Sequence, residues 1–261
     1  MPFVRHRGTG KISTAATFDS MAERWDSTWI EKKSSVEKDF SATEHWKWLK
    51  MYLPSSGRVL EAGCGPGHWV YSLNKLGYSA YGVDFARETI ERARKRWPHL
   101  HLVAGDMRAT IFESGDFDGI VSLGAVEHDE KGPEAALREM HRILKPGGFL
   151  YCTVPCMNHI NAMGLAALQE WVVCNRFIRR ITGRNPETQF FEYAYYPEEY
   201  ENILKAVGFE VIEIAPLRPH DAWRSFTLSR RIIDFLHSRN PFITCHMIAG
   251  VCRKPPARSS L

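Results

Sequence analysis

The chain has 261 residues, of which 44% are hydrophobic and 25% charged, which is ordinary for a soluble globular protein and enough for one large domain with insertions. The 34 basic and 30 acidic residues give a net charge of +4, and much of the excess lies near the two ends, as in solvated tails, so charge does not indicate a nucleic-acid partner. No apolar run reaches the 18 residues of a membrane span, and the first residues lack the apolar core of a signal peptide, which argues against an integral membrane segment.

The six cysteines fall mostly inside predicted strands and helices. They form no C-x-x-C pair and have no histidines at metal-ligand spacing nearby. We therefore expect reduced thiols, no metal site and a cytoplasmic protein.

Residues 1–16 are polar, and we expect them to be irregular. A helical pattern begins at Phe18, and an aromatic-rich helical stretch, which includes Trp25, continues as far as Pro54.

The segment Val59–Gly67 predicts a strand, a tight loop and then a helix. An apolar pair runs into Glu61, and glycine then occupies every second position, at Gly63, Gly65 and Gly67. Glycine backbones accept positive φ and allow a ligand to approach closely, and the N-terminus of the following helix carries free N–H groups. This arrangement predicts a nucleotide-type pocket.

The spacing of the glycines excludes two phosphate-binding motifs. The dinucleotide fingerprint needs a glycine where this chain has His68, and a P-loop needs a lysine after Gly67. The loop instead resembles motif I of the class I S-adenosylmethionine (SAM)-dependent methyltransferases. That resemblance implies that the loop and the helix N-terminus, Cys64 included, hold the methionine part of SAM.

Two further strand ends carry acids. Predicted strand Ser79–Val83 ends at Asp84, roughly 20 residues after the loop, where a carboxylate accepts hydrogen bonds from ribose hydroxyls; the alternative is that Asp84 caps the next helix. Predicted strand Leu100–Ala104 is followed by Gly105, Asp106 and Met107. The resemblance implies that Phe85 stacks on adenine, that Asp106 meets the adenine amino group and that Met107 packs on the ring.

The next predicted strand, Phe117–Gly124, is a nearly continuous apolar run, as in a parallel strand covered on both faces. A helix beginning at Pro133 and a strand at Phe149–Val154 follow, and the resemblance covers Val59 to Val154. Two more strands are predicted at Phe209–Ala215 and Ile243–Val251. We expect an α/β fold with a doubly wound, mostly parallel, seven-stranded Rossmann-like sheet.

The predicted organisation has four parts. The resemblance implies that residues 1–57 form a helical lid, for which simple helix packing is the alternative. Residues 58–154 form the SAM-binding core, 155–196 an insertion that caps the substrate, and 197–261 complete the core with a helical insertion at 217–242. Cofactor binding is assigned to Glu61, Gly63, Cys64, Gly65, Gly67, Asp84, Phe85, Gly105, Asp106, Met107, Leu123 and Gly124. Acceptor contacts are assigned to Trp25, His159, Tyr193 and Tyr196.

His128 is the candidate general base, because it follows the strand nearest the expected sulfonium and its intrinsic pKa is near neutrality. The alternative is that His128 orders the loop while alignment of the reactants alone supports the reaction. Glu127 is placed to orient the histidine.

The sequence predicts a SAM-dependent methyltransferase that acts on a small molecule by direct displacement, at oxygen. Nucleic-acid substrates are disfavoured because no Asn/Asp-Pro-Pro-aromatic run follows Gly124, and Pro155-Cys156 comes after the wrong strand for cytosine C5 chemistry. Two alternatives stay open: a non-catalytic subunit of the same fold that binds a partner protein, and the transfer of another group from a SAM-like nucleotide. The oligomeric state and the role of the arginines at 176–184, as a solvated face or a contact to an anionic substrate or membrane, also stay open.

Overall fold

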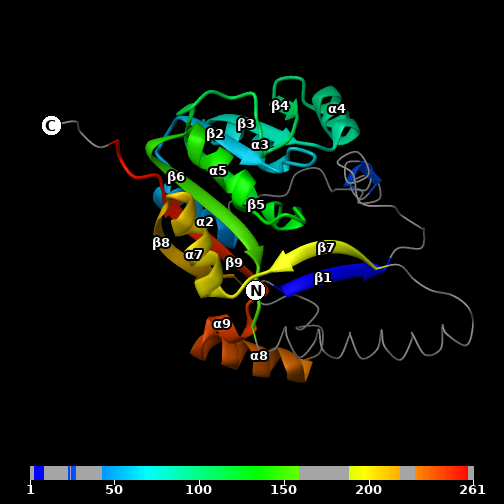
Figure 1. Cartoon of the computed structure of the whole chain (residues 1–261). Helices are drawn as coiled ribbons and strands as arrows, with labels where there is room; N and C mark the ends of the chain where they lie inside the picture. The colour runs from blue at the N-terminus through cyan, green and yellow to red at the C-terminus, as the bar shows by residue number, and fades with distance from the viewer. Residues whose placement is uncertain are drawn as a thin grey trace, which may run out of the picture.

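The computed structural model describes residues 3–8, 23, 25–27, 43–158, 188–217 and 227–257 (Figure 1). His159 and the greater part of the insertion at 155–196 therefore lie outside the described residues. The strands are β1 (Phe3–Gly8), β2 (Arg58–Ala62), β3 (Ser79–Asp84), β4 (His101–Ala104), β5 (Phe117–Leu123), β6 (Leu144–Pro155), β7 (Thr188–Ala194), β8 (Glu210–Pro216) and β9 (Met247–Arg253). The helices are α2 (Glu44–Tyr52), α3 (His68–Lys75), α4 (Arg87–Arg96), the 3₁₀ turn η2 (Val126–His128), α5 (Glu134–Ile143), α7 (Pro197–Val207), α8 (Thr227–Arg239) and α9 (Pro241–Thr244).

Seven strands form one sheet in the order β4-β3-β2-β5-β6-β9-β8. The pairs from β4 to β6 are parallel, and β9 runs antiparallel to both of its neighbours. The chain leaves β2 toward one edge of the sheet and returns to β5 on its other side. The order therefore reverses between β2 and β5, where ligands bind in open α/β sheets. The predicted doubly wound, mostly parallel sheet is confirmed.

Alternate residues of each strand supply the two cores on either face of the sheet. Leu60 and Leu150 pack in the core that contains α5 and α7, whereas Val59 and Tyr151 pack in the core that contains α2, α3 and α4. Figure 1 shows α5 and α7 on one side of the strands and α3 with α4 toward the β4 edge. The continuous apolar runs of the sequence reflect this double coverage.

A separate two-stranded sheet joins the beginning of the chain to the end of the first insertion. β1 pairs antiparallel with β7, from Phe3 opposite Ala194 to Gly8 opposite Thr188, and the two lie side by side in Figure 1. The expectation of irregular backbone is thus wrong for Phe3–Gly8. Cross-strand pairing with a distant segment decides the conformation there.

Two predicted strand starts also need correction. β6 begins at Leu144, which pairs with Phe117, while Phe149 pairs with Gly119, so residues 145–148 bulge out within the strand opposite Asp118. The last strand begins at Met247 rather than at residue 243. The side chain of Asn240 accepts from the N–H of Phe242 (3.1 Å) and begins the short helix α9.

No helix in the described part of the chain is long and apolar enough to cross a membrane.

Candidate functional site

The glycine loop between β2 and α3 has the backbone that the sequence predicts. Gly63, Gly65 and Gly67 have φ values of 79°, 47° and 77°, in the left-handed region that favours glycine. A Cβ on Gly63 would lie 2.4 Å from the Cβ of Ala125, which no real contact allows. The loop therefore needs glycine for its conformation and for its closeness to the segment after β5.

Two buried carboxylates hold this loop in place. Glu61 accepts from the backbone N–H of Val70 in α3 (3.2 Å), and Asp84 accepts from the N–H groups of Gly65 (2.7 Å) and Ala86 (2.8 Å). Burial raises the pKa of both carboxyl groups, well above the usual range for Glu61. The N-cap of α4 is Ala86, so the alternative of Asp84 as that cap is wrong, and Asp84 instead ties β3 to the loop.

A narrow cavity lies beyond the carboxyl ends of the strands. Its lining is Phe85, Asp106, Met107, Arg108, Ala125, Val126, His128, Asp129 and Ala136. It brings four predicted site residues to one wall, Phe85, Asp106, Met107 and His128, whereas Asp84 is not part of that lining. The cavity adjoins the glycine loop, because a Cβ on Gly63 would lie 3.5 Å from the Cε of Met107.

Other predicted cofactor residues surround the same region. The N–H of Gly105 donates to the carbonyl of Asp84 (2.9 Å), and the N–H of Gly124, after Leu123 at the end of β5, donates to Oγ1 of Thr153 (3.0 Å). Cys64 is buried in the loop, and burial raises the pKa of its thiol well above the usual range. The thiol is therefore kept protonated and inert.

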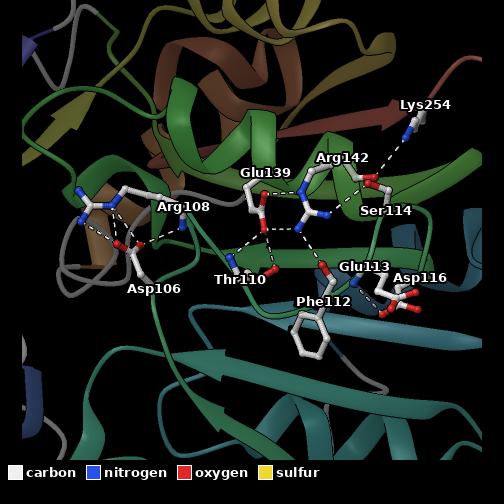
Figure 2. A network of polar contacts seen from close by, with 10 residues as sticks. All are labelled: Asp106, Arg108, Thr110, Phe112, Glu113, Ser114, Asp116, Glu139, Arg142 and Lys254. Carbon is white, nitrogen blue, oxygen red and sulfur yellow. Dashed lines mark hydrogen bonds and ion pairs between the residues drawn. The ribbon is translucent and has the colours of Figure 1, made fainter.

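Arg108 is a site residue that the sequence reasoning missed. Its guanidinium donates to both oxygens of Asp106 (2.8–3.0 Å) and to Asp129 (3.0 Å), as Figure 2 shows for Asp106. The hydrogen bonds that Arg108 donates to Asp106, against the opposing effect of burial, raise the pKa of Arg108 further. Its position two residues after the strand-end acid was the available signal, since that spacing allows an ion pair across a turn.

His128 lies at the end of η2, where its backbone N–H donates to the carbonyl of Ala125 (3.3 Å). Its ring packs edge-on against Trp25, with centroids 4.8 Å apart, and its Nε2 is 3.9 Å from Oε1 of Glu127. The side chain is 14% exposed. Trp25 was predicted to contact the methyl acceptor, and the structure thus places it directly against His128, the candidate general base.

Tyr193 and Tyr196 lie elsewhere. They line an open cavity of about 780 Å³ between the N-terminal ends of α5 and α7, together with Lys131, Glu134 and Glu198. The hydroxyl of Tyr193 donates to the carbonyl of Glu130 (2.8 Å). The structure does not bring these tyrosines to the cavity that contains His128.

The chemistry of these groups fits SAM. The side-chain-free loop beside α3 suits an amino-acid tail, the carboxylates of Asp84 and Asp106 suit hydroxyl and amino groups, and Phe85 with Met107 supplies apolar surface for a base. The cavity measures only about 40 Å³, far less than a nucleoside.

Comparisons with known proteins agree with this interpretation of the site. Residues 59–148 match a family model described as a methyltransferase domain. Demethylmenaquinone methyltransferase of Staphylococcus saprophyticus is 32% identical over 132 residues, which are 46% of this chain and 56% of that protein. The chain thus spans a little over half the length of this curated relative.

Two solved structures share the fold over most of the chain. One is 1,6-didemethyltoxoflavin-N1-methyltransferase of Burkholderia thailandensis, with 1,6-didemethyltoxoflavin and S-adenosylhomocysteine bound (TM-score 0.55, 15% identity, 97% of this chain and 99% of that chain). The other is the [4+2]-cyclase SpnF (TM-score 0.60, 15% identity, 95% of this chain and 100% of that chain).

The glycine loop with its buried acids, the sheet order and the match over residues 59–148 agree with one another. Residues 59–148, which carry the loop and its acids, match the methyltransferase domain family.

Proposed function

We propose that this protein transfers the methyl group of SAM to a hydroxyl of a small molecule by direct displacement, with His128 as the general base. The observation that carries the proposal is that His128 shares one cavity wall with Asp106 and Met107, the residues expected at the adenine. A base at that wall lies close to any acceptor that is aligned with the cofactor.

When bound, SAM supplies a methyl group made electrophilic by its sulfonium. The glycine loop and α3 would then hold the amino-acid tail, Asp84 would accept from the ribose, and Asp106, held by Arg108, would orient the adenine. Transfer of the methyl group to the acceptor hydroxyl would leave the proton of that hydroxyl to be removed by a residue of this chain. His128 takes the hydroxyl proton, while Trp25 shields its ring from water.

A small-molecule acceptor is supported by the names of the relatives, which act on demethylmenaquinone and 1,6-didemethyltoxoflavin. The match to methyltransferases does not favour the alternative of a non-catalytic subunit that binds a partner protein. One fold supports several reactions, and the [4+2]-cyclase SpnF shares this fold. The reaction therefore needs a direct test.

The proposal is tested with isotope-labelled SAM and metabolite extracts, followed by mass spectrometry of the labelled product and turnover measured on that product. His128→Ala should reduce turnover by more than about tenfold while the affinity for SAM changes little, because the histidine acts on the acceptor. His99→Ala, at an exposed position, is the matched control. Unchanged turnover in His128→Ala would remove the catalytic role.

Calorimetry with SAM tests the cofactor site separately. Asp84→Ala should abolish binding, and Asp106→Ala, at a side chain that is 28% exposed, should weaken binding by about tenfold if one hydrogen bond to the base is lost. Circular dichroism establishes that both variants fold. A wild-type protein that binds no SAM contradicts the proposal outright.

A further inference from the structure

Three side chains with titratable groups meet beside the cavity. One nitrogen of His128 and one carboxylate oxygen each from Glu127 and Glu192 all lie within 4.8 Å of one another. Both carboxylates are buried, with Glu127 only 2% and Glu192 only 8% exposed. Glu127 comes from the same turn as the histidine, but Glu192 comes from β7, in the separate two-stranded sheet.

The pairing of β1 with β7 accounts for the position of Glu192. Glu192 stands opposite Arg5, but the next pair is His6 with Phe190, so β7 has one extra residue, Phe191, beside Glu192. Such a bulge shifts the alternation of side chains along the strand and re-aims the residues next to it. β7 in turn packs beside η2, the turn that ends at His128.

We propose that Glu192 is a positioning residue that orients the imidazole of His128 and stabilises the imidazolium formed when His128 takes a proton. This inference rests on the proposed function of His128. A carboxylate beside a catalytic histidine fixes the ring and its tautomer and favours the charged ring. Glu192 supplies this from an element that the core methyltransferase domain does not contain.

Several other charged groups surround His128 and contribute to its electrostatic environment. Glu127 and Asp129 flank it in sequence, Arg108 pairs with Asp129 at 3.0 Å, and Asp106 lines the same cavity. On β1, Arg5 occupies the register position opposite Glu192. Glu192 lies on β7, so it can be neutralised without changing η2 or the Asp106–Arg108 pair.

The test combines NMR and kinetics on the full-length protein. In ¹⁵N-histidine-labelled protein, the titration midpoint of the His128 ring, assigned by its absence in His128→Gln, should move about one pH unit lower in Glu192→Gln, since a nearby negative charge is lost. The acid limb of the pH–rate profile should move with it, and maximal turnover should fall about tenfold, with little change in SAM affinity. Glu192→Asp should restore part of both effects, and Glu198→Gln, on exposed α7 surface, should change neither.

The outcomes separate this inference from the proposed function. If the midpoint moves but no methyl transfer is found with any acceptor, the contact stands and the transferase role fails. If methyl transfer occurs and both the midpoint and the pH–rate profile stay unchanged in folded Glu192→Gln, Glu192 does not position His128. Tight Mn²⁺ binding that Glu192→Gln abolishes would also overturn the inference, because the cluster would then be a cation site.

Discussion

At the scale of single residues, buried carboxylates and glycines share the task of shaping the loop. Glu61 and Asp84 accept backbone N–H groups, and burial raises the pKa of both. Their hydrogen bonds therefore hold the loop even where one of them is protonated, since a carboxylic acid keeps an acceptor oxygen. What the loop cannot accommodate is a Cβ at Gly63.

Gly63→Ala should lower the free energy of unfolding by about 2–4 kcal/mol, since it adds a collision with Ala125 to the strain of positive φ. Gly77→Ala is the matched control, because Gly77 has a φ of 91° and nothing within 4 Å of an added Cβ, so it should lose only about 1 kcal/mol. Urea unfolding measures both. Equal losses in the two variants would mean that the contact with Ala125 is unimportant.

At the scale of elements, a polar network fastens the segment after β4 to helix α5. Glu139 accepts from the N–H and hydroxyl of Thr110 (2.8 and 2.6 Å) and pairs with Arg142 (2.7 Å), which also donates to the carbonyl of Phe112 (2.7 Å). Figure 2 shows this network beside helix α5, with the separate contacts of Asp106 with Arg108 and of Glu113 with Asp116 on either side. Asp106, which lines the cavity, thus lies on the segment that this network attaches to helix α5.

Although burial opposes it, hydrogen bonding from Arg142 and Thr110 lowers the pKa of Glu139. A lowered carboxyl pKa stabilises the fold above the ordinary pKa of glutamate, and this contribution is lost as the pH falls below it. Glu139→Gln should therefore cost about 1–2 kcal/mol at pH 7 and less at pH 4. Urea unfolding at both pH values measures this, with the exposed Glu91→Gln as control; a loss that is the same at both pH values would contradict the argument.

At the scale of the whole molecule, the residue after β9 joins the end of helix α5 to the bulge in β6. Lys254 donates from its ammonium to the carbonyls of His141 (2.7 Å) and Leu144 (2.8 Å) at the end of α5, and its backbone pairs with Gly147 and Gly148. A cation at a helix C-terminus also interacts favourably with the helix dipole. The bulge in β6, helix α5 and strand β9 therefore share one anchor.

Lys254→Met should lower the free energy of unfolding by about 1–2 kcal/mol, because the carbonyls at the end of α5 lose a charged donor while the apolar stem is kept. SAM affinity should stay unchanged, since the anchor is remote from the glycine loop. Thermal unfolding with and without SAM measures both, and Lys95→Met, on the exposed face of α4, is the control. A change in SAM affinity without a change in stability would show that this anchor affects the site rather than the fold.

The sequence predicts well whatever depends on local pattern. The glycine loop, the acids after β3 and β4, and the apolar strands from β2 to β5 are each encoded by neighbouring residues, and the structure has them as expected. The pairing of β1 with β7 joins segments from opposite parts of the chain, and no local periodicity announces it. For that reason Phe3–Gly8 was not predicted as a strand and Glu192 was not predicted near His128.

The predicted site residues also divide into those that a local pattern places correctly and those that it cannot place. Phe85, Asp106, Met107 and His128 meet because each lies in the segment that follows β3, β4 or β5, and the ends of these parallel strands share one edge of a sheet. Tyr193 and Tyr196 follow no strand of that sheet, and their aromatic character alone could not place them. Arg108 belongs to the site through an ion pair across a turn rather than through any motif.

The sheet order has a consequence for how the molecule is made. The strands that carry the glycine loop and its acids are all translated before residue 124, whereas β8 has β9 as its sole neighbour in the described sheet. During synthesis, an emerging chain could therefore assemble β2 to β5 on the ribosome before β8 and β9 are translated. Correct folding in the cell would then depend on how long β6 and β8 lack their shared neighbour in the sheet, until β9 leaves the exit tunnel.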